Sequence, residues 1–469
     1  MNKSKLFLII VLVLVLLPLT ILIIAPSVIL SSKQGRGFVF KQVNKSIPGS
    51  LSAQECSGGW QQGLNCRQVT YTDQGMHLDV ADLSLSPGLW SLITTPEDLG
   101  TITLNEPVVV LARPVAQPAP SNEPKENSTV DAPQKSATEP SPETAATTEP
   151  EKDPAAEPGY LQKMQAKLVI NKALVRLDGT EQQEIIRNGN LVADIKEGNI
   201  DLDLDLGTGE NGQASVTGTL QLPPVFEGSL LEVLKTDVQL KLTNIQTGPL
   251  LLLAGGDTVP QGQGTLAADI KLASGDNGGL KVQGPIAITD VDMSGGVLGD
   301  DHPRFNKLAL ELDLQRASDN SWQVPVLQLF SDFGTLDLQC SYTESGFTGN
   351  GTGKIDLSLL LSQFPNLFKI REGLRLDKGE LNLALDLNKQ GERLEVLANA
   401  ALESLAGRRD RESFAWESPL RLNLDGKLEN NRPEVKKLTL EAPFLDLEGQ
   451  GTPEQFSLSG SANLDQAMR

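Results

Sequence analysis

Residues 199–222, NIDLDLDLGTGENGQASVTGTLQL, decide the fold class of this chain. Ile200, Leu202, Leu204 and Leu206 alternate with three aspartates, so a strand here places the aliphatic side chains on one face and the carboxylates on the other. The same period of two returns in later runs separated by Gly, Asn and Asp, and it predicts an all-β dominated protein built on an antiparallel meander. These runs are Val238/Leu240/Leu242, Leu266/Ala268/Ile270/Leu272, Leu308/Leu310/Leu312/Leu314, Leu381/Leu383/Leu385/Leu387 and Leu420/Leu422/Leu424.

Helical spacing is brief by comparison. It occurs near Phe226 to Leu234 and near Leu357 to Phe368, which predicts two short helices.

Part of the meander is repeated at an offset of 109 residues. The second copy ends in Gln-Ala-Met-Arg where a helix should begin, which suggests an incomplete repeat array. The matching residues are Leu336-Asp-Leu338, Phe347 and Ile355-Asp356 in the first copy and Leu445-Asp-Leu447, Phe456 and Leu464-Asp465 in the second.

The N-terminal stretch from Leu6 to Ala25, LFLIIVLVLVLLPLTILIIA, carries no charge. A helix of this length spans roughly the 30 Å hydrocarbon core of a membrane, so we expect an uncleaved transmembrane anchor. A cleaved signal peptide is the alternative, although this apolar run exceeds the usual h-region of about 7 to 15 residues. Basic residues lie on both sides of the stretch, so the positive-inside rule leaves its orientation open.

A Pro/Glu-rich segment at 113–158 divides the remaining chain. It holds no aromatic residue and cannot bury enough apolar surface to offset the entropy of ordering, so we expect a disordered linker. The predicted organisation is a stub and transmembrane helix over 1–30, a small β segment over 31–112, the linker, and a larger β domain over 159–469.

Composition excludes several classes of function. Among 469 residues, 60 acidic against 40 basic side chains give a net charge of −20, which argues against binding nucleic acid through its phosphates. Two isolated histidines and three dispersed cysteines cannot build a Cys/His zinc site. We expect no metal site.

Four motifs that resemble functional sites have simpler explanations. Gly207 to Gly212 matches GxGxxG but is followed by a strand pattern, which predicts a hairpin turn. Residues 349–355, GNGTGKI, lack the first Gly and the Ser or Thr of a P-loop. The Asp201/Asp203/Asp205 row is typical of a solvated strand face, and Asp300-Asp301-His302 of a turn. With no serine elbow and no HExxH motif, we expect no catalytic residue, no cofactor and no enzymatic activity, and an anchored hydrolase stays an unsupported alternative.

Cys56 and Cys66 flank Gly58-Gly59-Trp60, a spacing that a hairpin brings within bonding range in an oxidising compartment. Two free thiols are the alternative. Cys340 lies within a strand pattern and is expected to be a buried thiol.

From Gly49 to Pro114 the chain is a succession of short strands with Gly turns, a Pro87-Leu89-Trp90-Leu92 step, and then Ile102-Thr-Leu104 and Glu106-Pro107-Val108-Val109-Val110. Placed after a single N-terminal span, this succession resembles the N-terminal region of the AsmA-like (TamB-like) family. The VDMSGG turn at 291–296 and the paired units GTGKIDLSLLLSQFPNLF and GQGTPEQFSLSGSANLDQ resemble later repeats of that family.

The resemblance implies an anchor in the inner membrane, with the N-terminus cytoplasmic, and a periplasmic body rolled into a β-groove (a "taco") in a Gram-negative-type envelope. It implies phospholipid as the partner, for lipid transport or outer-membrane maintenance, with other envelope proteins as further partners. The candidate groove residues are Leu308, Leu310, Leu312, Leu314, Leu381, Leu383, Leu385 and Leu387. The alternative is an assembly protein for outer-membrane protein biogenesis, in which the same alternation closes a self-packed β-sandwich.

Overall fold

A computed structural model describes residues 27, 29–73, 75–112, 160–178, 183–223, 235–254, 256, 258–275, 279–371, 373–416 and 418–463. The expected span at 6–25, the linker at 113–158 and the expected helix at 226–234 lie outside these residues. Within the described part of the chain, no helix is long and apolar enough to cross a membrane.

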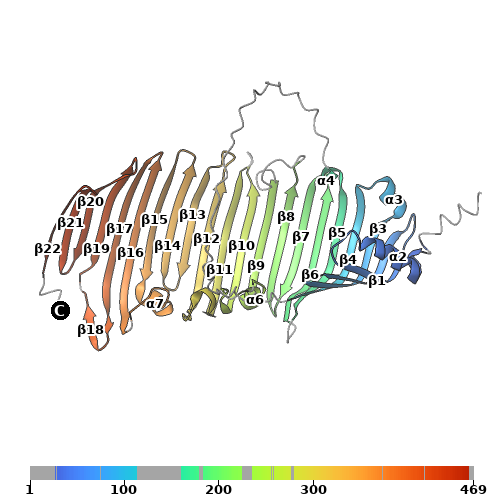
Figure 1. The fold of residues 1–469 in the computed structure, drawn as a ribbon, viewed down its shortest axis with the longest axis horizontal. Helices are drawn as coiled ribbons and strands as arrows, with labels where there is room; N and C mark the ends of the chain where they lie inside the picture. The colour runs from blue at the N-terminus through green and yellow to red at the C-terminus, as the bar shows by residue number, and fades with distance from the viewer. Residues whose placement is uncertain are drawn as a thin grey trace, which may run out of the picture.

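The alternating runs form strands of one 22-stranded sheet (Figure 1). The first half comprises β1 (Ser50–Ser57), β2 (Gly63–Asp73), β3 (Met76–Gly88), β4 (Asp98–Leu111), β5 (Gln165–Leu177), β6 (Gln183–Lys196), β7 (Asn199–Thr208), β8 (Gly212–Gln221), β9 (Lys235–Gln246), β10 (Gln261–Ser274) and β11 (Leu280–Ser294). The second half comprises β12 (Arg304–Arg316), β13 (Trp322–Ser331), β14 (Gly334–Thr343), β15 (Gly346–Asp356), β16 (Leu374–Gln390), β17 (Arg393–Arg409), β18 (Glu412–Ala415), β19 (Leu420–Glu429), β20 (Arg432–Ala442), β21 (Leu445–Thr452) and β22 (Gln455–Ala462).

Strands pair with their neighbours in chain order, except that the short β18 pairs with β17 and β19 then pairs with β17 directly. The prediction of an antiparallel meander is therefore confirmed for most of the sheet. It is wrong at one place, because β4 and β5 pair in parallel from Asp98↔Gln165 to Leu111↔Leu177. A parallel pair needs a long crossover connection, and here residues 112–164 join the two strands. The segments before and after the Pro/Glu-rich stretch thus share one sheet.

Many strands carry a β-bulge. Lys172, Asn188, Asn244, Asp290 and Ser404 adopt positive φ within strands, and the pairing register shifts beside each of them. A bulge bends its strand and increases the local twist. The sheet is therefore bent by its own backbone rather than flat.

Short helices lie at the ends of strands. They are α2 (Lys33–Val43), α3 (Leu89–Thr94), α4 (Tyr160–Lys163), α6 (Thr247–Ala254), the 3₁₀ helix η1 (Gly296–Leu298) and α7 (Leu357–Gln363).

The expectation of only two helices was wrong. Of the two, α7 is present over the first part of its predicted range and ends before Pro365, because a proline disfavours helical backbone in the residue before it. The others are short or, like α6 with its sequence TGPLLLLA, lack an apolar/polar period that could reveal them.

The buried core at the N-terminal end is small. Cys56, Cys66, Val69 and Val80 are buried together, and Phe40 of α2 packs against them. Ser32 caps the N-terminus of α2, because its hydroxyl accepts a hydrogen bond from the backbone N–H of Gly35 at 3.1 Å. Helix α2 therefore packs against this end of the sheet.

Candidate functional site

One face of the sheet is apolar over most of its length. In antiparallel pairing, residues opposite each other in register lie on the same face, so a row can be followed from strand to strand. One such row runs through Leu104, Ile170, Leu191, Leu204, Val216, Leu240 and Ile270, and continues beyond β11 through Leu312, Leu327, Leu338, Gly351, Leu385, Ala398 and Leu424. We call this side of the sheet the apolar face.

The eight leucines proposed from the sequence all lie on the apolar face. Leu310 of β12 pairs with Leu329, which pairs with Leu336 of β14. Leu336 pairs with Gly353, which pairs with Leu383 of β16. The two quartets of leucines are therefore parts of one surface.

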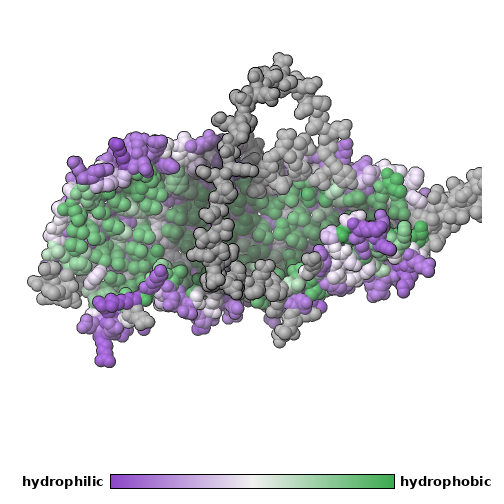
Figure 2. All heavy atoms as spheres, viewed as in Figure 1, coloured by the Kyte–Doolittle hydropathy of each residue, from purple (hydrophilic) through white to green (hydrophobic). Residues whose placement is uncertain are grey.

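These leucines are not buried. Leu383 and Leu385 keep 37% and 39% of their surface exposed. The other six are half-buried. In the described residues only eleven hydrophobic side chains are buried, and all of them belong to the first eleven strands. Figure 2 shows hydrophobic residues gathered over the sheet between hydrophilic rims. No second sheet covers this face in the described part of the chain, which differs from a self-packed sandwich.

The opposite face is polar and carries ion pairs, some between neighbouring strands, as Lys354 of β15 with Glu380 of β16, and some within one strand, as Arg393 with Glu395 of β17. Lys354 Nζ lies 2.8 Å from Glu380 Oε1, and Arg393 Nη2 lies 2.6 Å from Glu395 Oε1. The hydrogen bond from Lys354 lowers the pKa of Glu380, and the hydrogen bond from Arg393 lowers the pKa of Glu395. Both carboxylates are therefore charged at neutral pH. Water screens such exposed pairs, so they add little to stability, and their main effect is to keep this face in water.

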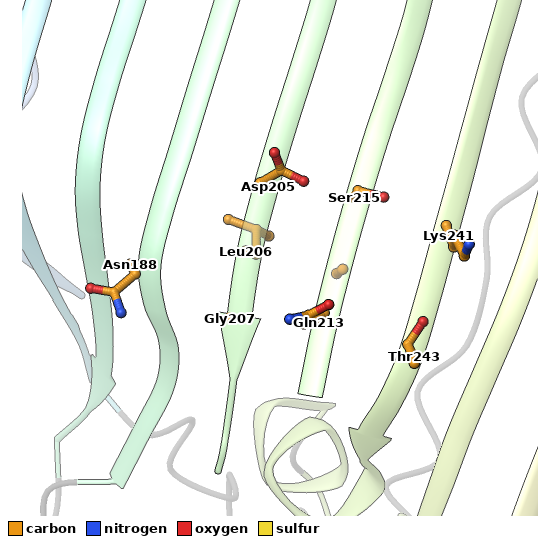
Figure 3. A pocket seen from close by; sticks show the side chains of 9 residues that line it. Asn188, Asp205, Leu206, Gly207, Gln213, Ser215, Lys241 and Thr243 are labelled. Carbon is orange, nitrogen blue, oxygen red and sulfur yellow. The ribbon is translucent and has the colours of Figure 1, made fainter. Parts of the chain in front are cut away.

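The polar face also contains shallow hollows. The one over β6 to β9 has a volume of about 510 Å³ and is lined by Asp205, Gln213, Ser215 and Lys241 among others (Figure 3). These side chains come from neighbouring strands and stand side by side, and no histidine or cysteine lines the hollow. The hollow is small beside the continuous apolar face.

The motifs weighed in the sequence fall on strands and turns. Gly207 to Gly212 closes the β7–β8 hairpin, where Gly209 takes the positive φ of 55° that the turn requires. Residues 349–355 lie within β15, and Asp201, Asp203 and Asp205 lie on the polar face of β7. Among the described residues, no group of three or more His, Cys, Asp or Glu side chains is placed to hold a metal ion.

Asp301 has a structural role that the sequence did not reveal. Its side chain is 1% exposed and accepts three hydrogen bonds, from Asn366 N at 2.8 Å, Asn366 Nδ2 at 2.9 Å and Leu367 N at 2.8 Å. The carboxylate thereby ties the loop after η1 to the segment after α7. The turn predicted for residues 300–302 therefore also holds together two connections at the same end of the strands. We call this set of hydrogen bonds the Asp301 clasp.

Cys56 and Cys66 are directly opposite in the β1–β2 register and are joined by a disulfide bond. Cys340 is a free, half-buried thiol in β14. The disulfide lies on the apolar face, since Cys66 pairs with Leu83 and Leu83 pairs with Leu104. It fixes the end of that face nearest α2.

No protein-family model, no curated protein and no solved structure matches this chain.

Proposed function

We propose that this protein shelters phospholipid acyl chains on the apolar face of its sheet, which the bulged strands curl into a groove. The observation that carries the proposal is an uninterrupted apolar face that no second protein layer covers in the described residues. Fully burying a leucine side chain is worth about 1.5–3 kcal/mol, and these leucines are at best half-buried. A hydrocarbon chain lying along the face would supply the missing burial.

The dimensions agree with a lipid path rather than a single pocket. With strands about 4.8 Å apart, 22 strands give a face about 100 Å long. A surface of that length can hold several acyl chains in succession. Since neighbouring rows of the face are chemically alike, a lipid could move along it without crossing a polar barrier.

The cellular setting is part of the same proposal. We infer from the resemblance to the AsmA-like family that residues 6–25 anchor the chain in the inner membrane, with the body in the periplasm. Phospholipid transport between membranes or outer-membrane maintenance then follows as the role, without catalysis. Protease added to spheroplasts should cut within 113–158, and resistance of this segment until the membrane is broken would contradict the orientation.

Native mass spectrometry of the detergent-extracted chain tests lipid binding directly. We expect phospholipid to co-purify and to be displaced by an excess of a second, isotope-labelled phospholipid. The double variant Leu310→Asp/Leu383→Asp should lose this lipid because a carboxylate would lie in the acyl path. The matched control is Ala309→Asp/Ala384→Asp, which places the same charges on the same strands but on the polar face. Wild-type protein free of lipid, or equal loss in both variants, would contradict the proposal.

A further inference from the structure

Three of the short helical segments lie at the same end of the strands. Helix α6 joins β9 to β10, η1 joins β11 to β12, and α7 joins β15 to β16, and Figure 1 shows α6 and α7 at the lower ends of their strands. The backbone N–H of Val297 in η1 donates to Thr258 O, beyond α6, at 3.0 Å. The Asp301 clasp joins the loop after η1 to the segment after α7. We call α6, η1, α7 and the loops 299–303 and 364–371 the helical rim.

The helical rim lies against the end of the apolar face at α7. A Cβ on Gly379 of β16 would lie 3.6 Å from Leu357 Cβ of α7 and 3.9 Å from Leu402 Cδ1. Leu402 belongs to the apolar face, since it is the register partner of Leu381. Helix α7 therefore packs beside side chains of that face.

The same holds at α6. A Cβ on Gly264 of β10 would lie 3.3 Å from Thr247 Oγ1, at the start of α6, and 3.3 Å from Ile288 Cγ2. Ile288 belongs to the apolar face, since it is the register partner of Leu308. The helical rim and the apolar face are thus continuous at both helices.

Large apolar side chains are exposed along the helical rim. The six that it exposes are Leu250, Leu252, Val297, Leu359, Leu367 and Phe368. Val297 and Leu367 are the most exposed of these, at 69% and 59%. The Asp301 clasp fixes the backbone of Leu367, whose N–H donates to the carboxylate at 2.8 Å. Hydrogen bonds of the backbone therefore hold apolar side chains at the surface.

Basic side chains accompany the exposed apolar ones. Lys369 and Arg371 follow directly after the last of them and are exposed. Neither forms an ion pair with another described residue. The acidic residues of the rim are Asp300 and Asp301, and Asp301 is buried in its clasp. In a chain of net charge −20, the rim therefore combines exposed apolar side chains with a local excess of exposed positive charge.

We propose that the helical rim docks on the surface of a lipid bilayer that contains anionic phospholipid. Its apolar side chains enter the boundary between headgroups and acyl chains, and Lys369 and Arg371 meet the phosphates. A second copy that docked through the same rim would bring the two basic pairs together, so it is a poorer occupant. The inference rests on the proposed function, because a bilayer at this end would let acyl chains pass between the membrane and the apolar face beside α6 and α7.

A fluorescent label on the rim of the full chain tests this docking, after detergent is removed in the presence of vesicles. Leu367→Cys in a Cys340→Ser background carries the environment-sensitive dye NBD, since Cys56 and Cys66 are joined by a disulfide. With phosphatidylcholine and phosphatidylglycerol in equal parts, we expect emission about threefold brighter than with phosphatidylcholine alone. Lipids with brominated acyl chains should quench it.

Two controls accompany the label. Ser318→Cys, labelled in the same way, should not respond, because residue 318 follows β12 at the opposite end of the strands. Lys369→Glu/Arg371→Glu should abolish the brightening at residue 367. Lys389→Glu/Arg432→Glu makes the same change of charge at exposed positions of the opposite end and should leave the brightening intact.

Equal emission with the two kinds of vesicle, or equal loss in both charge variants, would overturn the proposal. Brightening that rises with protein concentration in detergent alone would assign the rim to a second copy and overturn it as well. The outcome is separable from lipid binding on the apolar face. Leu310→Asp/Leu383→Asp changes that face but not the rim, so this variant should keep the response of the label whether or not the face binds lipid.

Discussion

Leu310 and Leu383 lie in one row of the sheet, although 73 positions separate them in the chain. The row passes through β13, β14 and β15, and each step is a register pair of directly opposite residues. A side chain changed at either position therefore alters the same apolar surface. This relationship is the basis of the first prediction.

The single variants Leu310→Asp and Leu383→Asp should each reduce bound phospholipid, and the double variant should reduce it no further than the more severe single. The physical reason is that both charges interrupt one continuous path. Because both leucines are partly exposed, we expect the cost in folding stability to be below the 2–5 kcal/mol typical of deleting a buried leucine. Quantitative lipid extraction and thermal melting should be run on the same samples. Unfolding of either variant without any lipid in the wild type would contradict a lipid-binding face.

The disulfide between Cys56 and Cys66 sets how many thiols can be alkylated before reduction. Alkylation of unfolded, unreduced protein should label only Cys340, and reduction should raise the number of labelled thiols to three. Three labelled thiols before reduction would show that the bond is absent from the protein as purified.

The double variant Cys56→Ser/Cys66→Ser should destabilise the β1–β2 hairpin by about 3 kcal/mol, because the closed loop of about ten residues loses its constraint on the unfolded chain. Hydrogen exchange over residues 50–73 measures this local change. Cys340→Ser is the control and should leave exchange in that hairpin unchanged.

The clasp at Asp301 should be sensitive to removal of its carboxylate. In Asp301→Ala, the N–H groups of Asn366 and Leu367 lose their acceptor, at a cost of about 2–4 kcal/mol to the local fold. We expect trypsin to cleave faster after Lys369 and Arg371. Mass spectrometry of the fragments measures the cleavage rate. Asp300→Ala removes the neighbouring, exposed carboxylate and should not change the cleavage rate. Equal acceleration in both variants would show that charge, rather than the clasp, protects this segment.

The contact between Asp292 and His302 should depend on pH. His302 Nε2 lies 2.5 Å from Asp292 Oδ1, and Arg304 Nε lies 3.3 Å from Asp292 Oδ2. The hydrogen bond with His302, followed by the charge of Arg304, holds the pKa of Asp292 below its ordinary value. Because the folded pKa is the lower one, the stabilisation is fully present above the unfolded pKa and is lost as the pH falls through the folded pKa.

The test compares the wild type with Asp292→Asn by hydrogen exchange over residues 293–303. We expect greater protection in the wild type at pH about 5, well above the ordinary pKa of an aspartate near 3.9. The difference should shrink as the pH falls through the lowered pKa of Asp292. A difference that persists at the lowest pH would show that the carboxylate charge is not what holds the loop.

The sequence predicted the strands well where one period of two ran uninterrupted, as at Leu308 to Leu314 and Leu381 to Leu387. Both runs are strands, and all eight leucines share a face. The parallel pairing of β4 with β5 could not be read in the same way, because alternation is identical in parallel and antiparallel strands. The role of Asp301 was also missed, since aspartates that follow a glycine-containing turn are common and its hydrogen-bond partners lie 65 and 66 residues away.

The sequence by itself determined which side chains share a face, because successive side chains of a strand point to opposite sides whatever the strand packs against. Only the tertiary structure decided that these faces align into one surface, because strand register depends on pairing between segments far apart in the chain. It also decided whether a second layer of the described chain covers that surface. An apolar face can pack against a second sheet equally well, and only the arrangement of the described strands, in a single layer, leaves it open.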